Sequence, residues 1–441
     1  MAVKKISLGS KAQQLIARDE RLFSTSNARE YPLVIDRARG AEVWDIEGNR
    51  YIDFMSGIAV TGTGHAHPEV VKAIKEQAEK FVHICLSDFY YEVAVELAEK
   101  LNEIRPFKEP ARMFFTNSGA EAVEAAMKLA RYHTKRPNYI AFQGAFHGRT
   151  MGALSLTGSK FVQKAGFQPL VPGVTHVPYP NEYRPVIAQR PGEDYGEAIV
   201  RYIEDRVFAT TVPPESVAAI FVEPIQGEGG YIIPPQGFLP ALRRLCDQHG
   251  ILLVVDEIQT GVGRTGKWWA VEHFGVEPDI YTSAKGLASG MPLGAMIARE
   301  SVMTWGHGAH GSTYGGNPVA CAAAVATLRL IEGGYMQNAA EVGAFVTDAL
   351  EELLPRHPHM DHVRGKGLMI GVEIVKDRTS REPAPMLRNQ VVQEAFQRGL
   401  LVLGAGTSTL RLIPPLMVDR GTAEEALHIL DEALSAAEAA S

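Results

Sequence analysis

Short apolar runs alternate with amphipathic stretches through the middle of the chain. In the amphipathic stretch 121–133, Val123, Ala126, Met127 and Ala130 recur at helical spacing, which predicts a helix with one buried face. The apolar runs are too short for helices and lack polar alternation, which is typical of strands buried on both faces. Such strands are predicted over 112–116, 139–142, 217–223, 251–257, 279–285 and 294–298.

Strands that alternate with helices indicate an α/β fold with a mostly parallel central sheet flanked by helices. In sheets of this kind, ligands bind beyond the carboxyl ends of the strands. The residues that follow each strand are therefore the candidates for chemistry. The proline-rich stretch 175–200 shows neither pattern and is expected to be a long loop.

The two ends of the chain show a different pattern. Residues 31–55 alternate between polar and apolar and turn at Gly40 and Gly48, which predicts a small antiparallel unit. From about residue 335 the pattern predicts a helix, strands and a final helix. We therefore predict a large domain over 63–332 and a small α+β lobe built from both termini, namely the N-terminal segment 1–62 and a C-terminal domain over 333–441.

Composition narrows the class of protein. With 441 residues, 46% hydrophobic and 22% charged, the chain has the profile of a soluble globular protein. Its formal net charge of -7 and the absence of basic runs argue against a nucleic-acid partner. The apolar runs are strand-length, so we expect no membrane span. Three cysteines without close spacing, and no signal peptide, fit a cytoplasmic protein.

One candidate site follows the strand at 112–116. Ser118 and Glu121 have the spacing of a capping box, and a capped helix is the simplest interpretation. The functional interpretation is a phosphate site, because Gly119 lets backbone N–H groups approach an anion at a helix N-terminus. The segment contains neither G-x-G-x-x-G nor Gly-Lys-Ser/Thr, which argues against a nicotinamide oxidoreductase and a P-loop enzyme.

Two further candidates end two later strands. Asp256 ends an apolar strand, and a carboxylate in such a position needs a cation or hydrogen bonds. A metal ion is not favoured, because no histidine or cysteine accompanies Asp256. Lys285 ends the next strand among small residues. The simplest interpretation of an isolated lysine is a side chain that extends into solvent. A half-buried lysine, by contrast, can lose its proton and act as a nucleophile. An anion cradle, a carboxylate and a lysine together are what pyridoxal 5'-phosphate (PLP) requires.

The chain resembles the class III, ornithine/4-aminobutyrate type, PLP-dependent aminotransferases of fold type I. Seven segments carry the resemblance in the family's order: GHAHPEV (64–70), NSGAEAVEAAMKLAR (117–131), FHGRTMGALSLTG (146–158), EPIQGEGG (223–230), DEIQTGVGRTG (256–266), SAKGLASGMPLGA (283–295) and GSTYGGNPVA (311–320).

The resemblance implies the contacts with PLP. Lys285 would form the Schiff base and then move the proton, and Asp256 would pair with the pyridinium nitrogen. The remaining contacts are Gln259 to the ring hydroxyl, Phe146 on the ring face, and Ser118, Gly119 and Ala120 on the phosphate. Thr313 would reach the phosphate bound by a neighbouring subunit, so a homodimer is implied, with a dimer of dimers as a further possibility.

The resemblance also implies the substrate contacts. Arg149 and Arg411 would each bind a substrate carboxylate, since a guanidinium suits bidentate recognition. Glu228 would neutralise Arg411 in one half-reaction, although a purely structural ion pair is the alternative. Ile58 would form an apolar wall, and we expect Glu223 to hold Arg149.

Three histidines in these motifs invite other roles. His65 and His67 lie two residues apart, but no third ligand is evident, so no metal site is expected. His147 is interpreted as a structural or supporting residue, because Lys285 already fills the role of a base.

We therefore expect an aminotransferase that moves the amino group of an ω-amino acid to 2-oxoglutarate by a ping-pong mechanism. The favoured donor is 4-aminobutyrate, followed by ornithine or lysine. An amino-acid racemase or epimerase of the same family stays open, because it would use the same PLP contacts. A non-catalytic binding protein is disfavoured by the intact Lys285, Asp256 and Gln259.

Overall fold

The computed structural model describes residues 9–440, which divide into two compact units. One unit is Pro68–Met336, and the other combines the chain up to His67 with the chain from Gln337 onward. The sequence-predicted boundaries lay after residues 62 and 332. The second unit is therefore assembled from both termini of the chain.

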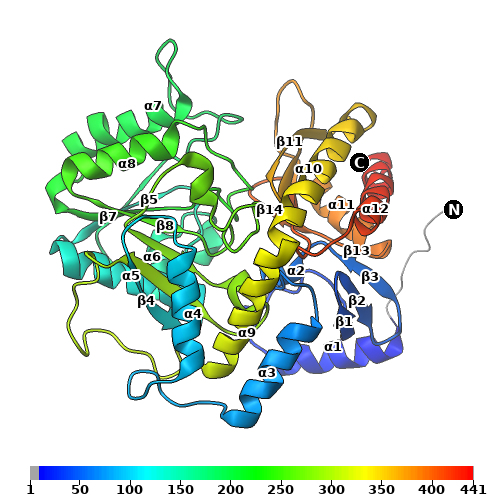
Figure 1. Cartoon of the computed structure of the whole chain (residues 1–441). Coiled ribbons are helices and arrows are strands. Elements are labelled where there is room, and N and C mark those ends of the chain that lie inside the picture. The colour runs from blue at the N-terminus through cyan, green and yellow to red at the C-terminus, as the bar shows by residue number, and fades with distance from the viewer. Residues whose placement is uncertain (1–8, 441) are drawn as a thin grey trace. The chain divides into compact units, whose positions relative to one another are not determined.

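A seven-stranded sheet forms the centre of the larger unit (Figure 1). Its order is β4 (Ala111–Thr116), β10 (Gly294–Arg299), β9 (Ile280–Ser283), β8 (Leu252–Asp256), β7 (Val217–Val222), β5 (Asn138–Phe142) and β6 (Val174–Val177). The six predicted strands are all present. Only β10 runs antiparallel to its neighbours, so the sheet is α/β and mostly parallel, as expected.

The reversed strand β10 brings the ends of β4 and β9 to the same edge. Gly294, the first residue of β10, lies opposite Thr116, the last residue of β4. The next residue, Ala295, lies opposite Ser283 at the end of β9. On the other side of β9, Asp256 at the end of β8 is paired with Thr282. All three candidate segments therefore leave the sheet at one edge.

Helices pack on this sheet and bury it. The helix α5 (Gly119–Thr134) lies across one face, and its buried residues join a core with β5, β7, β8, β9 and β10. The predicted positions Val123, Ala126, Met127 and Ala130 are all buried, which confirms the helical periodicity. The other helices of eight or more residues in this unit are α3 (Pro68–Lys80), α4 (Glu92–Glu103), α7 (Tyr195–Tyr202), α8 (Phe238–His249) and α9 (Pro318–Leu330).

The stretch 175–200 is more ordered than the sequence predicts. Residues Val174–Val177 form β6, which pairs with β5 at the edge of the sheet, and α7 begins at Tyr195. The prediction of a long loop was therefore wrong at both ends. An edge strand needs no continuous apolar run, and β6 is only partly buried.

The smaller unit contains two four-stranded sheets. The predicted N-terminal unit is β1 (Ile35–Arg39), β2 (Glu42–Asp45) and β3 (Arg50–Asp53), to which β13 (Leu400–Leu401) from the C-terminal part adds in parallel. The second sheet has the order β11 (Met360–Lys366), β12 (Met369–Ile374), β15 (Thr409–Leu412) and β14 (Leu403–Ala405). The helices of eight or more residues are α1 (Ser10–Leu22), α10 (Met336–Leu353), which begins one residue before this unit, α11 (Pro385–Gln397) and α12 (Arg420–Ala439).

One helical stretch, Pro318–Arg356, is long and apolar enough to cross a membrane by length and composition. Within this stretch, 61% of the most apolar 18-residue segment is buried inside the protein. Residues Pro318–Leu328 of α9 are all buried, so the hydropathy is that of a core helix.

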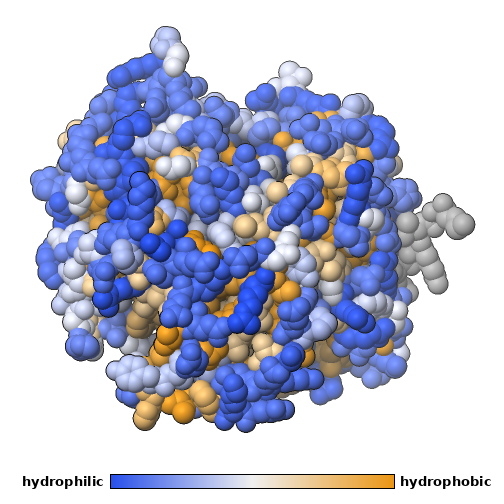
Figure 2. All heavy atoms as spheres, viewed as in Figure 1, coloured by the Kyte–Doolittle hydropathy of each residue, from blue (hydrophilic) through white to orange (hydrophobic). Residues whose placement is uncertain are grey.

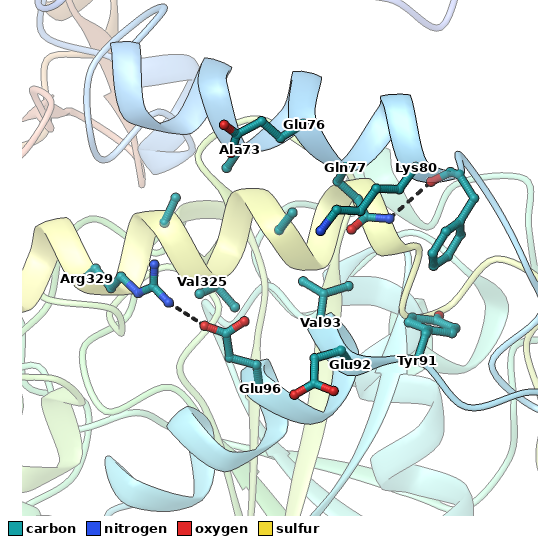
Figure 3. A pocket seen from close by; sticks show the side chains of 13 residues that line it. Ala73, Glu76, Gln77, Lys80, Tyr91, Glu92, Val93, Glu96, Val325 and Arg329 are labelled. Carbon is teal, nitrogen blue, oxygen red and sulfur yellow. Dashed lines mark hydrogen bonds and ion pairs between the residues drawn. The ribbon is translucent and has the colours of Figure 1, made fainter.

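The face shown in Figure 2 carries apolar residues over the region where α3, α4 and α9 lie in Figure 1. A groove of about 270 Å³ runs between these helices (Figure 3). Small side chains such as Ala73, Ala322 and Ala326 line it, and the ion pair between Arg329 and Glu96 closes one side. The alanines explain the hollow, because they bring three helices together without filling the space between them.

Candidate active site

Asp256 stands at the centre of a buried hydrogen-bond network at the end of β8. Its Oδ1 accepts hydrogen bonds from Thr282 Oγ1 and the Ile258 backbone N–H, each at 3.1 Å. Its Oδ2 lies 2.8 Å from Nδ1 of His147, which follows β5. Sequence reasoning placed Asp256 correctly at a strand end and missed both side-chain partners.

His147 is fully buried, and its ionisation depends on Asp256. Burial alone lowers the pKa of the imidazole, but the hydrogen bond and the negative charge of Asp256 outweigh burial and raise it above 6.5. The backbone N–H of His147 also donates a hydrogen bond to Thr157 Oγ1 at 2.9 Å. The structure therefore gives His147 a definite role, that of orienting the Asp256 carboxylate through a buried hydrogen bond.

Glu223 does not hold Arg149, contrary to the sequence-based prediction. One carboxylate oxygen accepts from the Phe146 backbone N–H at 2.9 Å and the other from the Gly227 N–H at 2.8 Å. Burial raises the pKa of Glu223 to about 7. Buried backbone N–H groups need acceptors, so Glu223 ties the segment after β5 to its own loop instead of reaching the exposed Arg149.

The N-terminus of α5, the predicted anion cradle, presents backbone N–H groups at the start of the helix. Ser118 is the N-cap, and its Oγ accepts from the Glu121 N–H at 3.3 Å. Glu121 reaches back to the backbone N–H of Asn117 at 2.6 Å, one residue earlier than a standard capping box. No acceptor for the backbone N–H of Ser118, Gly119 or Ala120 lies among residues 9–440. These donors, at the positive end of a helix dipole, suit a phosphate.

Close packing joins the anion cradle to the Asp256 network. A Cβ on Gly119 would lie 2.8 Å from Cδ1 of Ile258, two residues after Asp256. A Cβ on Gly148, between His147 and Arg149, would lie 2.8 Å from Cβ of Ala120. Glycine at both positions therefore lets three segments from different strands approach one another.

Lys285 lies three residues after Thr282, the hydrogen-bond partner of Asp256. The residue is half-buried, and its φ of 44° lies in the left-handed region, where a non-glycine residue is uncommon. Such a conformation at the end of β9 is characteristic of functional turns. Lys285 therefore meets both requirements of the sequence prediction, a strand end and partial shelter from water.

Buried polar atoms test whether these residues fit PLP. Within residues 9–440, Gln259 Oε1, His147 Nε2 and Ser283 Oγ are buried without a hydrogen-bond partner. A buried polar atom without a partner is costly, and these three lie in the segments that end β8, β5 and β9. A polar ligand would supply partners, and the anion cradle, Asp256 and Lys285 complete the set of groups that PLP requires.

Two further predicted residues of the larger unit lie outside the buried network. The guanidinium of Arg149 is exposed and lies 5.7 Å from the ring centre of the half-buried Phe146. Thr313 is exposed in the segment between β10 and α9. Their accessibility is what contacts with a substrate and with a second subunit would need, and both contacts remain predictions.

Glu228 lies in a tight loop after β7. Its carboxylate accepts a hydrogen bond from Lys160 Nζ at 2.6 Å, a partner that sequence reasoning missed. A Cβ on the preceding Gly227 would lie 2.7 Å from Nε2 of Gln259, so the loop packs directly on a predicted PLP contact.

In the smaller unit, Ile58 occupies an unusual turn. Ser56, Gly57, Ile58 and Ala59 all have positive φ, with Ile58 at 66°, so α2 (Ser56–Ala59) is a left-handed turn. Left-handed geometry is especially unfavourable for a β-branched residue. Ile58 is 41% exposed, and its role as an apolar wall stays a prediction.

The left-handed turn is anchored by Asp53. Its Oδ1 accepts from the N–H groups of Met55 and Ser56, and its Oδ2 lies 2.7 Å from His65 Nε2. His65 thus supports a turn, and residues 9–440 contain no group of three side chains that could hold a metal. Arg411, in β15, is buried within the same unit.

Taken together, the fold and the site define a PLP-dependent enzyme of fold type I. The family model described as aminotransferase class-III matches residues 23–434. The chain therefore belongs to the class III aminotransferases, and PLP is its cofactor.

The chain is similar to relatives of two kinds. It is 43% identical over 433 residues to an alanine/serine racemase of Pyrococcus horikoshii, covering 97% of this chain and 91% of the relative. It is 40% identical over 411 residues to a 4-aminobutyrate aminotransferase of Mycobacterium leprae, covering 91% of each.

A solved (S)-enantioselective omega-transaminase of Thermomicrobium roseum matches with a TM-score of 0.89 at 34% identity, covering 98% of this chain and all of the other. Relatives that are named as racemases and relatives that are named as aminotransferases thus stand at similar identity.

Proposed function

We propose that the protein transfers the amino group of an ω-amino acid to 2-oxoglutarate, with 4-aminobutyrate as the favoured donor and ornithine or lysine next. The observation that carries the proposal is Glu228, a carboxylate in a loop that packs on Gln259. An ω-amino acid has no carboxylate on the carbon that bears its reacting amine, whereas glutamate has one there. A carboxylate that neutralises Arg411 in one half-reaction and releases it in the other would serve both substrates.

PLP supplies an electron sink for the carbon that bears the substrate amine. Asp256 supplies the negative charge that keeps a pyridine nitrogen protonated, and His147 holds its carboxylate in place. Lys285 Nζ would take the proton from the carbon that bears the amine and deliver it, on the same face, to the former aldehyde carbon of the cofactor, so that the amino group stays with the cofactor when the oxo acid leaves. Arg149 and Arg411 bind the carboxylates of the two substrates, and Ile58 forms the apolar wall.

A second candidate is an amino-acid racemase, which the 43% identity to the alanine/serine racemase supports. A racemase would use the same residues around PLP but return the proton to the opposite face. It would need no amino acceptor, so Glu228 would have no switching role.

One assay separates the two functions. Purified holoenzyme is incubated with a panel of L-amino acids and ω-amino acids, with and without 2-oxoglutarate. Glutamate formation is followed together with optical inversion by chiral chromatography. Glutamate that forms only with 2-oxoglutarate supports the aminotransferase, and the fastest donor identifies the substrate. Inversion of an L-amino acid without an acceptor would overturn the proposal in favour of the racemase.

We further propose that the enzyme is a cytoplasmic homodimer with Thr313 near the partner's PLP. An apolar groove of about 520 Å³ is lined by side chains such as Leu86, Ala94 and Val95 and by Gly315, two residues after Thr313. Large apolar side chains close to it in sequence are exposed: Val82, Ile84, Phe89, Tyr90 and Tyr314. A second copy would bury them. Sedimentation of the native protein and of Val95→Glu would test the proposal, which predicts a dimer that the substitution weakens.

A further inference from the structure

Lys160 forms an ion pair with Glu228. Lys160 Nζ lies 2.6 Å from Glu228 Oε1, and the two side chains are 43% and 19% exposed. The lysine belongs to none of the residues assigned to PLP or substrate. Its partner, by contrast, is the carboxylate on which the proposed exchange of substrates depends.

The backbone around Glu228 is held rigidly. Gln226 and Ile232 exchange two backbone hydrogen bonds, at 3.0 and 3.1 Å, which close the loop at its base. Gly227 donates to Glu223 and packs against Gln259. The position of the Glu228 backbone is therefore fixed beside Gln259, and the direction of its side chain is what its ionic partners decide.

The backbone that leads to Lys160 is anchored to the segment before Phe146. Gly158 donates to the Ala145 carbonyl at 2.7 Å and accepts from the Gly144 N–H at 3.0 Å. Ser159 Oγ then hydrogen-bonds Gln163 at 2.7 Å and fixes the turn after Lys160. The ammonium of Lys160 is thus presented to Glu228 from the segment that follows β5, next to a predicted PLP contact.

We propose that Lys160 is a positioning residue that sets the charge felt by the substrate. By pairing with Glu228, it neutralises a carboxylate beside the site and lets a substrate with a second carboxylate bind. The inference rests on the proposed role of Glu228 near the substrate. It adds a residue, Lys160, and a substrate property, the number of carboxylates.

The partial exposure of the pair suits this role. An exposed ion pair contributes little to stability, so its carboxylate can exchange partners without a large energetic cost. Removal of the lysine charge would leave Glu228 to repel a dicarboxylate. For two charges separated by several ångströms in high dielectric, we expect about a three- to tenfold loss of affinity.

The test compares two ligands with the same five-carbon chain, glutarate and pentanoate, which differ by one carboxylate. Isothermal titration of the PLP-loaded enzyme gives the ratio of their dissociation constants without any turnover. The proteins compared are the native enzyme, Lys160→Met, Lys160→Arg, Glu228→Gln and the double variant Lys160→Met/Glu228→Gln. Circular dichroism and the absorption of bound PLP establish that each variant is folded and loaded.

We expect Lys160→Met to weaken glutarate about three- to tenfold relative to pentanoate, and added salt to reduce this difference. Lys160→Arg should keep the native ratio, because the charge remains. The double variant should return towards the native ratio, because the repelling carboxylate is gone. A merely structural role for Lys160 would weaken both ligands alike.

An unchanged ratio in Lys160→Met overturns the inference, as does a native enzyme that does not bind glutarate. A double variant as weak for glutarate as Lys160→Met also overturns it, since Lys160 would then bind the ligand itself. The proposed function fails separately: an enzyme that forms no glutamate from ω-amino acids, yet shows the expected ratios, would refute the donor and leave the role of Lys160 standing.

Discussion

His147 Nδ1 lies 2.8 Å from Asp256 Oδ2, and both side chains are buried. The pair links the segment after β5 to the end of β8 and raises the pKa of His147. A buried carboxylate is costly to leave without its hydrogen-bond partner, so the contact with His147 matters to Asp256.

Replacing His147 with alanine should therefore lower kcat/KM. A lost hydrogen bond to a charged group corresponds to about 1.5–3 kcal/mol, or roughly a 10- to 100-fold decrease. His147→Asn, which can place an amide donor near the position of Nδ1, should recover part of the loss. Steady-state kinetics of the two variants would check this, and equal rates for alanine and native enzyme would refute the role of His147.

Replacing Lys285 with alanine should abolish turnover and the visible absorption band of lysine-linked PLP. The reason is that no other lysine ends a neighbouring strand at this edge of the sheet in residues 9–440. Lys72→Ala, at a lysine of α3 whose side chain is 72% exposed, provides a loaded control. A Lys285→Ala protein that retained the band or turned over substrate would contradict the assignment.

Glycine-to-alanine substitutions should distinguish two kinds of close contact. A Cβ on Gly294 would lie 2.5 Å from the Ser118 carbonyl oxygen, which is backbone, whereas a Cβ on Gly119 would meet the side chain of Ile258 at 2.8 Å. The Ile258 side chain can move and the Ser118 backbone cannot. We expect Gly294→Ala to lose about 1–3 kcal/mol of unfolding free energy and Gly119→Ala less.

Both glycine substitutions also bear on PLP, because Ser118 caps the anion cradle. Fluorescence titration of the apoenzyme should show weaker PLP binding by Gly294→Ala than by Gly119→Ala. The reverse order, in stability or in affinity, would mean that the contact at Ser118 is not limiting.

The pKa of Glu223, raised by burial from 4.5 to about 7, predicts a pH dependence of stability. Between these values the folded protein keeps a proton that the unfolded chain has released. The stabilisation is complete below about pH 4.5 and is lost as pH rises through about 7, by up to about 3 kcal/mol. Urea unfolding at about pH 5 and about pH 8 would measure the decrease.

Glu223→Gln should reduce the slope of stability against pH without abolishing it. Burial also raises the pKa of Glu257 to about 7, so that residue keeps its own contribution in the same window. The variant should be less stable overall, since its amide cannot accept from both Phe146 and Gly227. An unchanged slope would show that Glu223 stays ionised throughout.

The left-handed turn at Ile58 predicts a conflict between stability and activity. Ile58→Gly relieves a φ of 66° and should raise the free energy of unfolding by about 1 kcal/mol. It also removes the proposed apolar wall, so kcat/KM should fall. Ile58→Ala loses the wall and relieves less strain. Denaturation and kinetics on both variants would test this; an Ile58→Gly enzyme less stable than the alanine variant would refute the strain.

The sequence predicts well what depends on local pattern. The six predicted strands of the larger unit are continuous apolar runs, and the helix α5 has a regular apolar face, so both are visible from the sequence. The strand β6 lies at an edge and is partly exposed, so its residues carry no such signal. The next long helix after β6, α7, has only eight residues, so its pattern is also short.

The site is predictable only as far as motifs mark it. Lys285, Asp256 and the segment at Ser118 stand out because each follows a strand. The contact between His147 and Asp256 joins residues 109 positions apart, and no spacing rule announces it. The left-handed conformation of Ile58 runs against the preference of a β-branched residue, so propensity would predict the opposite.

The reversed strand β10 has a consequence for the handling of this enzyme. Because β10 separates β4 from β9, the anion cradle and Lys285 grow from strands that are not hydrogen-bonded to each other. PLP bound by both segments would link the end of β4 to the end of β9, in addition to the pairing of each strand with β10. Protein produced without enough of the vitamin that supplies PLP should therefore melt earlier and be cut more readily by proteases than the loaded form.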